Sequence, residues 1–308
     1  DVLGEDCVSD RRGYLRLWRA LNKLLATGKY DLVAPLYGSF LGLLCAAQRR
    51  VPCALSFAGS DLNGRTEPGR MSLRSLCVPA SQLAAFLAAG VSVPNAQMRA
   101  ALWWPTARRA ARVIPDGVDT RRFHPRPLSE ARLRRGLPPG GARVAFVALG
   151  DATERPYKRL ELARAAVARL PGVALDVLSQ VPFAEMPFAY AACNALLLTS
   201  LDEGSPNCVK EALACGVPVV AVDAGDAREL LFGLSGCEIA PADPDALSAA
   251  LARVLACKSG CPDGPERIET RYSLDACADA FADFHRETVR GDGRRAPEVV
   301  RPIGRITA

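Results

Sequence analysis

The sequence is poor in histidine, in lysine and in long apolar runs. Its 308 residues include two histidines, five lysines and 6% aromatic residues. Two histidines exclude a histidine-rich metal site and argue against a histidine-based triad. No apolar run approaches the ~20 residues that span a bilayer. The polar segment 1–12 does not have the pattern of a signal peptide.

Cysteine is present, but without the spacing of a zinc site or a disulfide framework. The 11 cysteines are an odd number, and several lie inside apolar stretches. Such thiols behave as small buried hydrophobic groups. We therefore expect them to be reduced and the protein to be cytoplasmic.

The positive charge is modest overall and uneven along the chain. The formal net charge is +6, yet residues 99–143 contain 11 arginines against three acidic residues. This arginine band could attract phosphate or the inner face of an anionic membrane, as a peripheral contact. It could equally be a solvated surface. Few aromatic residues are interleaved with it, so no nucleic-acid partner is expected.

Strand-like and helix-like segments alternate in both halves of the chain. The segments 144–149, 195–198 and 217–222 are continuously apolar, which is typical of strands with helices on both faces. The alternation predicts an α/β protein with parallel sheets. A segment rich in Pro, Gly and Arg over 123–141 predicts a linker. We expect two domains, 1–125 and 126–290, with a mobile tail over 291–308.

The segment 198–212 carries the strongest signal for a binding site. A buried strand is expected to end at Ser200, with Ser205 capping the next helix and Pro206 in its first turn. The first amides of a helix have no internal partner and suit a diphosphate. Gly204 would let a ligand approach the backbone closely.

Two carboxylates flank this helix start, Glu203 before it and Glu211 within it. Carboxylates can accept hydrogen bonds from the hydroxyl groups of a sugar. They can also simply stabilise the positive end of the helix. The spacing alone leaves both interpretations open.

Several stretches resemble the retaining GT-B glycosyltransferases of family 4, also called glycosyl transferases group 1. These are Glu203-Gly204-Ser205-Pro206-Asn207, the segment 211–220, the segment 114–119 and, more weakly, 30–33 and 57–61. The resemblance implies two Rossmann-like domains whose parallel sheets face each other across a crevice. No Gly-rich first strand is visible near Asp1, so the N-terminal acceptor domain is expected to lack that strand. Ala58 also stands where many members have histidine.

The resemblance implies roles for individual residues. Glu211 would hold the ribose of the nucleotide, Glu203 would contact the donor sugar, and the amides around Gly204–Asn207 would bind the diphosphate. Lys158, with Arg155 as its companion, would neutralise the leaving phosphate without a metal or cofactor. Weaker candidates for contact with the acceptor are Asp61 and Gly59.

The implied activity is transfer of a sugar, in the hexosyltransferase class, from a UDP-, GDP- or ADP-sugar to an unknown acceptor with retained configuration. The acceptor would be a sugar or a lipid-linked sugar, as in cell-envelope or polysaccharide biosynthesis. The alternative is a truncated or degenerate GT-B protein that binds a sugar nucleotide or a partner without turnover.

Three other enzyme classes have less support. A metal-dependent transferase would use an Asp-x-Asp motif, but Asp243-Pro244-Asp245 precedes an expected helix, where Asp243 is a natural cap. A nucleotide-sugar epimerase would need more acid–base groups. A dinucleotide oxidoreductase is disfavoured because no Gly-x-Gly-x-x-Gly opens either half.

Overall fold

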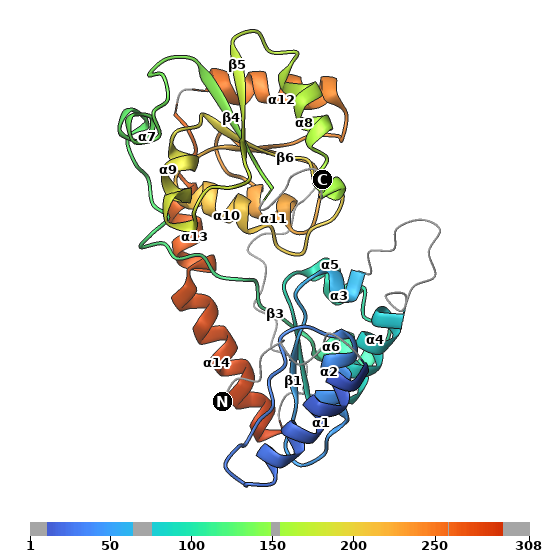
Figure 1. Cartoon of the computed structure of the whole chain (residues 1–308). Helices are drawn as coiled ribbons and strands as arrows, with labels where there is room; N and C mark the ends of the chain where they lie inside the picture. Colours follow the sequence, from blue (N-terminus) through green and yellow to red (C-terminus); the bar gives the residue numbers. More distant parts are fainter. Residues whose placement is uncertain (1–10, 64–75, 149–154, 258, 292–308) are drawn as a thin grey trace. The chain divides into compact units, whose positions relative to one another are not determined.

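A computed structural model describes residues 11–63, 76–148, 155–257 and 259–291 (Figure 1). The chain divides into two compact units: unit 1 is residues 1–114 and 281–308, and unit 2 is residues 115–280. The composition predicts boundaries at 125 and 290 instead. The difference arises because α14 (Leu274–Arg290) begins in unit 2 and ends in unit 1. The expected tail beyond Gly291 and the start of the helix expected from Met71 lie outside the described residues.

Unit 1 contains a parallel sheet of three strands in the order β1-β2-β3. Its core joins α1, α2, α4, β1 and β2. Its elements, besides the end of α14, are α1 (Arg11–Leu25), α2 (Ser39–Ala47), β1 (Ala54–Ser56), α3 (Ser60–Asn63), α4 (Cys77–Leu87), β2 (Gly90–Val93), α5 (Ala96–Ala100), α6 (Pro105–Ala110) and β3 (Arg112–Val113).

The apolar segment Tyr30–Leu36 has the composition of a short buried strand, but it forms only two isolated bridges, Val33 to Cys53 and Leu36 to Ser56. This segment does lie beside β1, since the Ser56 N–H donates to the Pro35 carbonyl oxygen at 3.1 Å. Proline has no N–H to donate. The hydrogen-bond ladder is therefore interrupted within the segment.

Unit 2 contains a parallel sheet of five strands in the order β5-β4-β6-β7-β8. Its elements, besides the start of α14, are α7 (Leu128–Arg134), β4 (Ala142–Val147), η4 (Pro156–Lys158), α8 (Leu160–Val167), β5 (Val173–Leu178), η5 (Phe183–Glu185), α9 (Met186–Ala191), β6 (Ala195–Leu198), α10 (Asn207–Ala214), β7 (Val219–Ala221), α11 (Ala227–Leu231), β8 (Glu238–Ile239), α12 (Pro244–Ala256) and α13 (Gly264–Tyr272).

The two faces of this sheet explain the continuously apolar strands. On β6, Leu196 and Leu198 pack against α9, α10, α11 and α13. Ala195 and Leu197 point to the other face and pack against α8 and α12. Figure 1 shows α8 and α12 together and α10 and α11 together. Successive residues of a strand face opposite sides, so a sheet covered on both sides needs apolar residues throughout, as predicted.

The segment expected to be a linker, 123–141, contains the helix α7 and a buried arginine. Arg132 is 2% exposed. Its guanidinium donates to the carbonyl oxygens of Ala192, Pro139 and Gly141 and to Oδ1 of Asn194, at 2.6 to 3.1 Å. Hydrogen bonds from Arg132 hold this helix in place, and local helix propensity does not. The Pro- and Gly-rich composition therefore gave no sign of the helix.

We expect Arg132→Met to lower the free energy of unfolding by about 3 kcal/mol, because several buried acceptors lose their donor. Urea denaturation would measure this. Arg134→Met in the same helix is the control. Arg134 pairs with Glu185 but its side chain is 51% exposed, so its loss should cost less than ~1 kcal/mol. Equal losses for the two variants would contradict the structural role of Arg132.

Much of the arginine band is engaged within its own unit. Arg112 pairs with Glu287, Arg121 with Asp275, Arg122 with Asp119, Arg134 with Glu185 and Arg143 with Asp176. These pairs and the buried Arg132 leave fewer arginines of the band available to an anionic partner. The expectation of such a partner is weakened accordingly. Among the described residues, no helix combines the length and the hydropathy needed to cross a membrane.

Candidate active site

The loop between β6 and α10 contains most of the residues singled out in the sequence. The structure corrects two expectations about it. Pro206 is the N-cap of α10 and not its first helical residue, and no side chain caps the helix. The Ser205 hydroxyl instead donates to Oδ2 of Asp226 at 2.7 Å. A charged acceptor makes a stronger hydrogen bond than a neutral one, so Ser205 anchors the loop and leaves the helix start open.

Lys158 and Glu203 meet, although they are far apart in the sequence. The Lys158 Nζ atom lies 2.5 Å from Oε1 of Glu203, and the two side chains are 14% and 13% exposed. Burial acts to lower the pKa of Lys158, but the interactions with Cys208 and Glu203 outweigh it and the pKa is raised. Lys158 is therefore a fixed cation at neutral pH.

The turn that carries Lys158 is fastened to the end of β6. The Thr199 hydroxyl lies 2.7 Å from the Lys158 carbonyl oxygen, to which it donates. In return, Nε of Arg159 donates to the Thr199 carbonyl oxygen at 2.6 Å. The backbone of Arg159 is left-handed, with φ of 54°, a conformation that is costly for a residue with a side chain. These bonds hold Lys158 at the carboxyl end of the sheet.

Glu211 lies one turn into α10 and is held by Tyr190 of α9. The fully buried Tyr190 donates its hydroxyl hydrogen to Oε2 of Glu211 at 2.7 Å. Burial raises the pKa of Glu211, while the Tyr190 hydrogen bond and the nearby charge of Lys210 oppose that rise. Tyr190 is a partner that the sequence reasoning missed.

The buried Cys208 lies among the three charged groups predicted for the site. Burial raises the pKa of its thiol to about 12, the charge of Lys158 acts in the opposite direction, and the carboxylates of Glu203 and Glu211 reinforce the rise. The structure thus brings Lys158 into contact with Glu203 just before α10, and Glu211 lies one turn into that helix.

Lys210 was also missed by the sequence reasoning. It is fully buried, and its Nζ donates to the carbonyl oxygen of Asp116 at 2.6 Å. Burial lowers the pKa of Lys210. This side chain ties α10 to the segment 114–119, which is one of the stretches that carry the family resemblance.

Asp226 supports the loop from the other side. Its Oδ1 atom is buried without a hydrogen-bond partner among the described residues. Burial raises the pKa of Asp226 from 3.8 to about 6, despite the Ser205 hydrogen bond and the Lys210 charge, which lower it. The preceding Gly225 has φ of +60°, and a Cβ there would collide with the carbonyl oxygen of Gly204. The two loops are therefore in close contact.

We expect Asp226→Asn to stabilise the protein at pH 7.5 by about 1 to 3 kcal/mol. The folded state binds a proton at Asp226 more tightly than the unfolded state, so wild-type stability should fall as the pH rises from about 4 to about 6. Asp226→Asn should lose that dependence. Thermal unfolding from pH 4 to 8 would measure it, with the exposed Asp279→Asn as control. An unchanged pH profile would contradict this assignment.

The remaining predicted residues of the C-terminal half lie around the same loop. Gly204, Pro206 and Asn207 form the approach to α10. Arg155 precedes η4, with Nη1 3.4 Å from the Tyr157 hydroxyl oxygen, and it adjoins the undescribed residues 149–154. The structure describes no contact between Arg155 and Glu203.

The weaker candidates are Asp61 and Gly59, which lie in unit 1. Gly59 directly precedes the short helix α3, and Asp61 lies within it. The carboxylate oxygens of Asp61 accept hydrogen bonds from the backbone N–H groups of Gly38, Ala58 and Gly59 at 2.8 to 3.3 Å. Asp61 is 1% exposed, and its burial raises its pKa although these amides oppose the rise. This geometry favours a structural role for Asp61.

An open cavity of about 460 Å³ lies at the carboxyl ends of β6, β7 and β8. Among its lining residues are Arg159, Ser200, Val222 and Ala240. Parallel α/β sheets bind ligands at this edge. The cavity therefore provides open space next to the turn that carries Lys158.

Within the described ranges, no three His, Cys, Asp or Glu side chains are grouped so that they could hold a metal ion. In the Asp-x-Asp sequence, Asp243 caps α12, as expected, by accepting hydrogen bonds from the Asp245 and Ala246 amides at 3.0 and 2.9 Å. Asp245 pairs with Arg169.

Known proteins match the chain in sequence. Residues 131–257 match the family model of glycosyl transferases group 1. A D-inositol 3-phosphate glycosyltransferase of Segniliparus rotundus is 28% identical over 60% of this chain and 48% of its own length. A GDP-mannose-dependent alpha-mannosyltransferase of Mycobacterium tuberculosis is 35% identical over 41% of this chain and 36% of its own length. The chain spans about half the length of the curated relatives it matches, or less.

Solved structures match the fold. Sucrose-phosphate synthase from Thermosynechococcus elongatus superposes with a TM-score of 0.75 at 20% identity, over 90% of this chain and 78% of that one. Anabaena Alr3699/HepE in complex with UDP superposes with a TM-score of 0.69 at 19% identity, over 87% and 82%. The fold is therefore that of the GT-B glycosyltransferases, and residues 131–257 are similar in sequence to the glycosyl transferases of group 1.

Proposed function

We propose that this chain transfers a sugar from a nucleotide-sugar donor to an acceptor, with the donor diphosphate bound at the start of α10. The observation that carries the proposal is the meeting of Lys158 with Glu203 beside the uncapped helix end. Glu211 lies one turn into the same helix. The cation and the amides at the start of α10 match the diphosphate of such a donor. The carboxylates of Glu203 and Glu211 match its sugar and its ribose.

Sugar transfer from a nucleotide donor requires stabilisation of the negative charge on the leaving group. When the glycosidic bond breaks, charge develops on the departing nucleoside diphosphate, and a preorganised cation in a partly buried site lowers that barrier. An ammonium group has three N–H donors, so the single contact with Glu203 does not exhaust those of Lys158. Arg155 is proposed as a second cation. This arrangement performs the transfer without a metal ion.

Glu211 is proposed to accept hydrogen bonds from the ribose hydroxyl groups and Glu203 from the donor sugar. Tyr190 orients Glu211, and Ser205 with Asp226 holds the loop of Gly204, Pro206 and Asn207 around the diphosphate. We propose that the configuration at the sugar carbon is retained, as the resemblance to family 4 implies.

The names of the matched proteins guide the choice of donor. Two relatives are named as GDP-mannose-dependent, and structures of Alr3699/HepE contain UDP, UDP with glucose or UDP-glucose. A UDP- or GDP-hexose is therefore the first donor to test, with an ADP-sugar after them. For the acceptor we propose a sugar or a lipid-linked sugar, and we propose that Asp61 and Gly59 shape its side of the site through the turn they build.

The test is thermal stabilisation by UDP-, GDP- and ADP-sugars, with NAD as the dinucleotide control, followed by product analysis. Stabilisation by one sugar nucleotide, turnover in EDTA and a retained anomeric configuration by NMR would support the proposal. Stabilisation by NAD alone, or by none of the sugar nucleotides, would contradict it. Binding without transfer or hydrolysis would favour the non-catalytic alternative.

A further inference from the structure

Unit 1 exposes a group of large apolar side chains on α4 and on the segment leading into α6. We call it the aromatic patch; it consists of Leu83, Phe86, Trp103 and Trp104, which are 43%, 50%, 56% and 38% exposed. Isolated apolar residues on a surface are ordinary. A contiguous group marks an interaction site more often than chance.

Two members of the aromatic patch, Phe86 and Trp104, are in contact. Their rings lie 4.7 Å apart. The Trp104 ring is held by Gln82 on α4, whose backbone carbonyl oxygen accepts from the indole at 3.0 Å. The side-chain oxygen of Gln82 accepts from the backbone N–H of Trp103 at 2.8 Å and so holds the backbone there. The Trp104 ring is thus presented to solvent at little cost in side-chain entropy.

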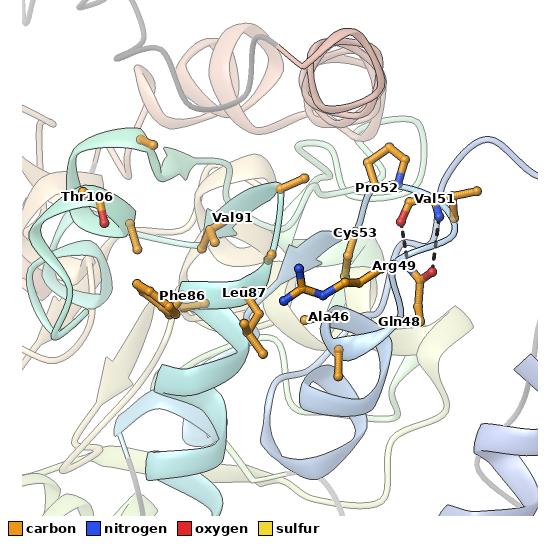
Figure 2. A pocket seen from close by; sticks show the side chains of 16 residues that line it. Ala46, Gln48, Arg49, Val51, Pro52, Cys53, Phe86, Leu87, Val91 and Thr106 are labelled. Atoms are coloured by element: carbon orange, nitrogen blue, oxygen red, sulfur yellow. Dashed lines mark hydrogen bonds between the residues drawn. The ribbon is translucent and has the colours of Figure 1, made fainter. Parts of the chain in front are cut away.

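A pocket of about 670 Å³ adjoins the aromatic patch and shares Phe86 with it. It lies at the amino ends of β1 and β2, between the ends of α2 and α4 and one side of α6. Figure 2 shows Phe86 and Thr106 on one side of the pocket, and Arg49 extending from the end of α2 toward Leu87. The lining residues are mostly Ala, Val, Leu and Pro, and Gln48, Arg49 and Thr106 add polar groups, so the pocket offers apolar side chains beside polar ones.

The chain around the patch and the pocket is rich in positive charge and poor in acidic residues, although the exposed Asp31 lies two residues before Val33, which bridges Cys53 of the pocket lining. The segments 32–60 and 76–115 contain no Asp or Glu, whereas residues 11–114 as a whole hold 15 Lys and Arg against three Asp and Glu. Exposed arginines next to the pocket are Arg49, Arg50 and Arg109. The carboxylate of Glu287 on α14 is paired with Arg112.

We propose that the aromatic patch and the arginines beside the pocket dock unit 1 on an anionic phospholipid bilayer. Tryptophan and phenylalanine settle at the boundary between headgroups and acyl chains. Each arginine near the surface adds attraction to anionic lipids. The pocket gives an acyl segment a place to enter. This combination of apolar rings with arginine, on segments poor in acidic residues, is complementary to such a membrane.

The membrane is favoured over other partners by the chemistry of the surface. Nucleic acid would match the arginines but not an apolar pocket. A second copy of this chain would match the apolar patch, but it would bring the same positive charge into the contact. The proposal does not depend on glycosyl transfer, so failure of the proposed function would leave it standing.

The test is co-sedimentation of the full chain with vesicles of phosphatidylcholine alone and of phosphatidylcholine with 30% phosphatidylglycerol. We expect binding to the anionic vesicles only, weakened at least tenfold by raising NaCl from 50 to 500 mM. Arg49→Glu with Arg109→Glu should weaken it at least tenfold, and Leu83→Ser with Trp103→Ser at least fivefold. Circular dichroism would check that each variant folds.

The matched control is Arg164→Glu with Arg271→Glu, two exposed arginines of unit 2, which should bind like the wild type. Equal binding to neutral and anionic vesicles, or wild-type binding by both patch variants, would overturn the proposal. So would a wild-type dimer in sedimentation equilibrium that Trp103→Ser converts to a monomer, because the patch would then be an interface between copies.

Discussion

Lys158→Ala should lower the rate of sugar transfer by roughly 100- to 1,000-fold, the effect typical of removing one preorganised charge from a transition state. The cation is nearly buried beside Glu203, so water cannot replace it efficiently. Because the charge acts mainly on the departing diphosphate, the loss should fall on kcat more than on KM. Steady-state kinetics with the donor identified by thermal shift would measure both constants.

Two controls make this result interpretable. Lys23→Ala removes an exposed lysine of unit 1 and should leave the rate within twofold of the wild type. Glu203→Gln removes the ion pair but keeps Lys158 and the shape of the side chain at position 203. Comparing it with Lys158→Ala separates the effect of losing the lysine from the effect of losing the ion pair. A rate near that of the wild type in Lys158→Ala would refute the role assigned to Lys158.

Glu211→Ala should lower kcat/KM for the donor by roughly 10- to 100-fold, since a hydrogen bond to a charged group contributes about 1.5 to 3 kcal/mol. The variant also leaves the buried Tyr190 hydroxyl without its acceptor, so a lower melting temperature is expected. Steady-state kinetics and thermal unfolding of the same variant would show the two effects.

Glu211→Gln and a deoxyribose donor separate binding from stability. Gln retains an acceptor for Tyr190, so it should restore most of the melting temperature. A donor whose ribose lacks a hydroxyl group should lose affinity for the wild type but not for Glu211→Ala. If the wild type and Glu211→Ala lost the same affinity on going from the normal to the deoxyribose donor, Glu211 would not be the ribose contact.

The local sequence pattern predicts the buried strands and the helix cap that depend on neighbouring residues alone. The strands β6 and β7, and β4 from Val144 onward, are continuously apolar because two helical layers cover them. The cap of α12 by Asp243 follows from residue type and position alone. The positions of Lys158, Glu203 and Glu211 came from the resemblance. Lys158 and Glu203 form an ion pair in the structure, and the roles given to all three residues stay predictions.

Contacts between distant segments could not be read from the sequence. The Thr199 bond to the Lys158 turn spans 41 residues, and the Ser205 bond to Asp226 spans 21. Ser205 has the residue type of a cap, and only the fold places a buried carboxylate near it. Lys210 looks like an exposed helix residue, yet the carbonyl oxygen of Asp116 permits its burial. A buried lysine of this kind has no local signature.

The passage of α14 from one unit into the other affects how the protein can be divided for study. Gly90 at the start of β2 lies against Phe284 and Thr288 of that helix, so closely that a Cβ on Gly90 would collide with both side chains. A fragment ending at Ile114 would lack this covering and leave the start of β2 open to water. Expressing the N-terminal half alone therefore requires grafting the final helical turns onto it or supplying them as a separate peptide.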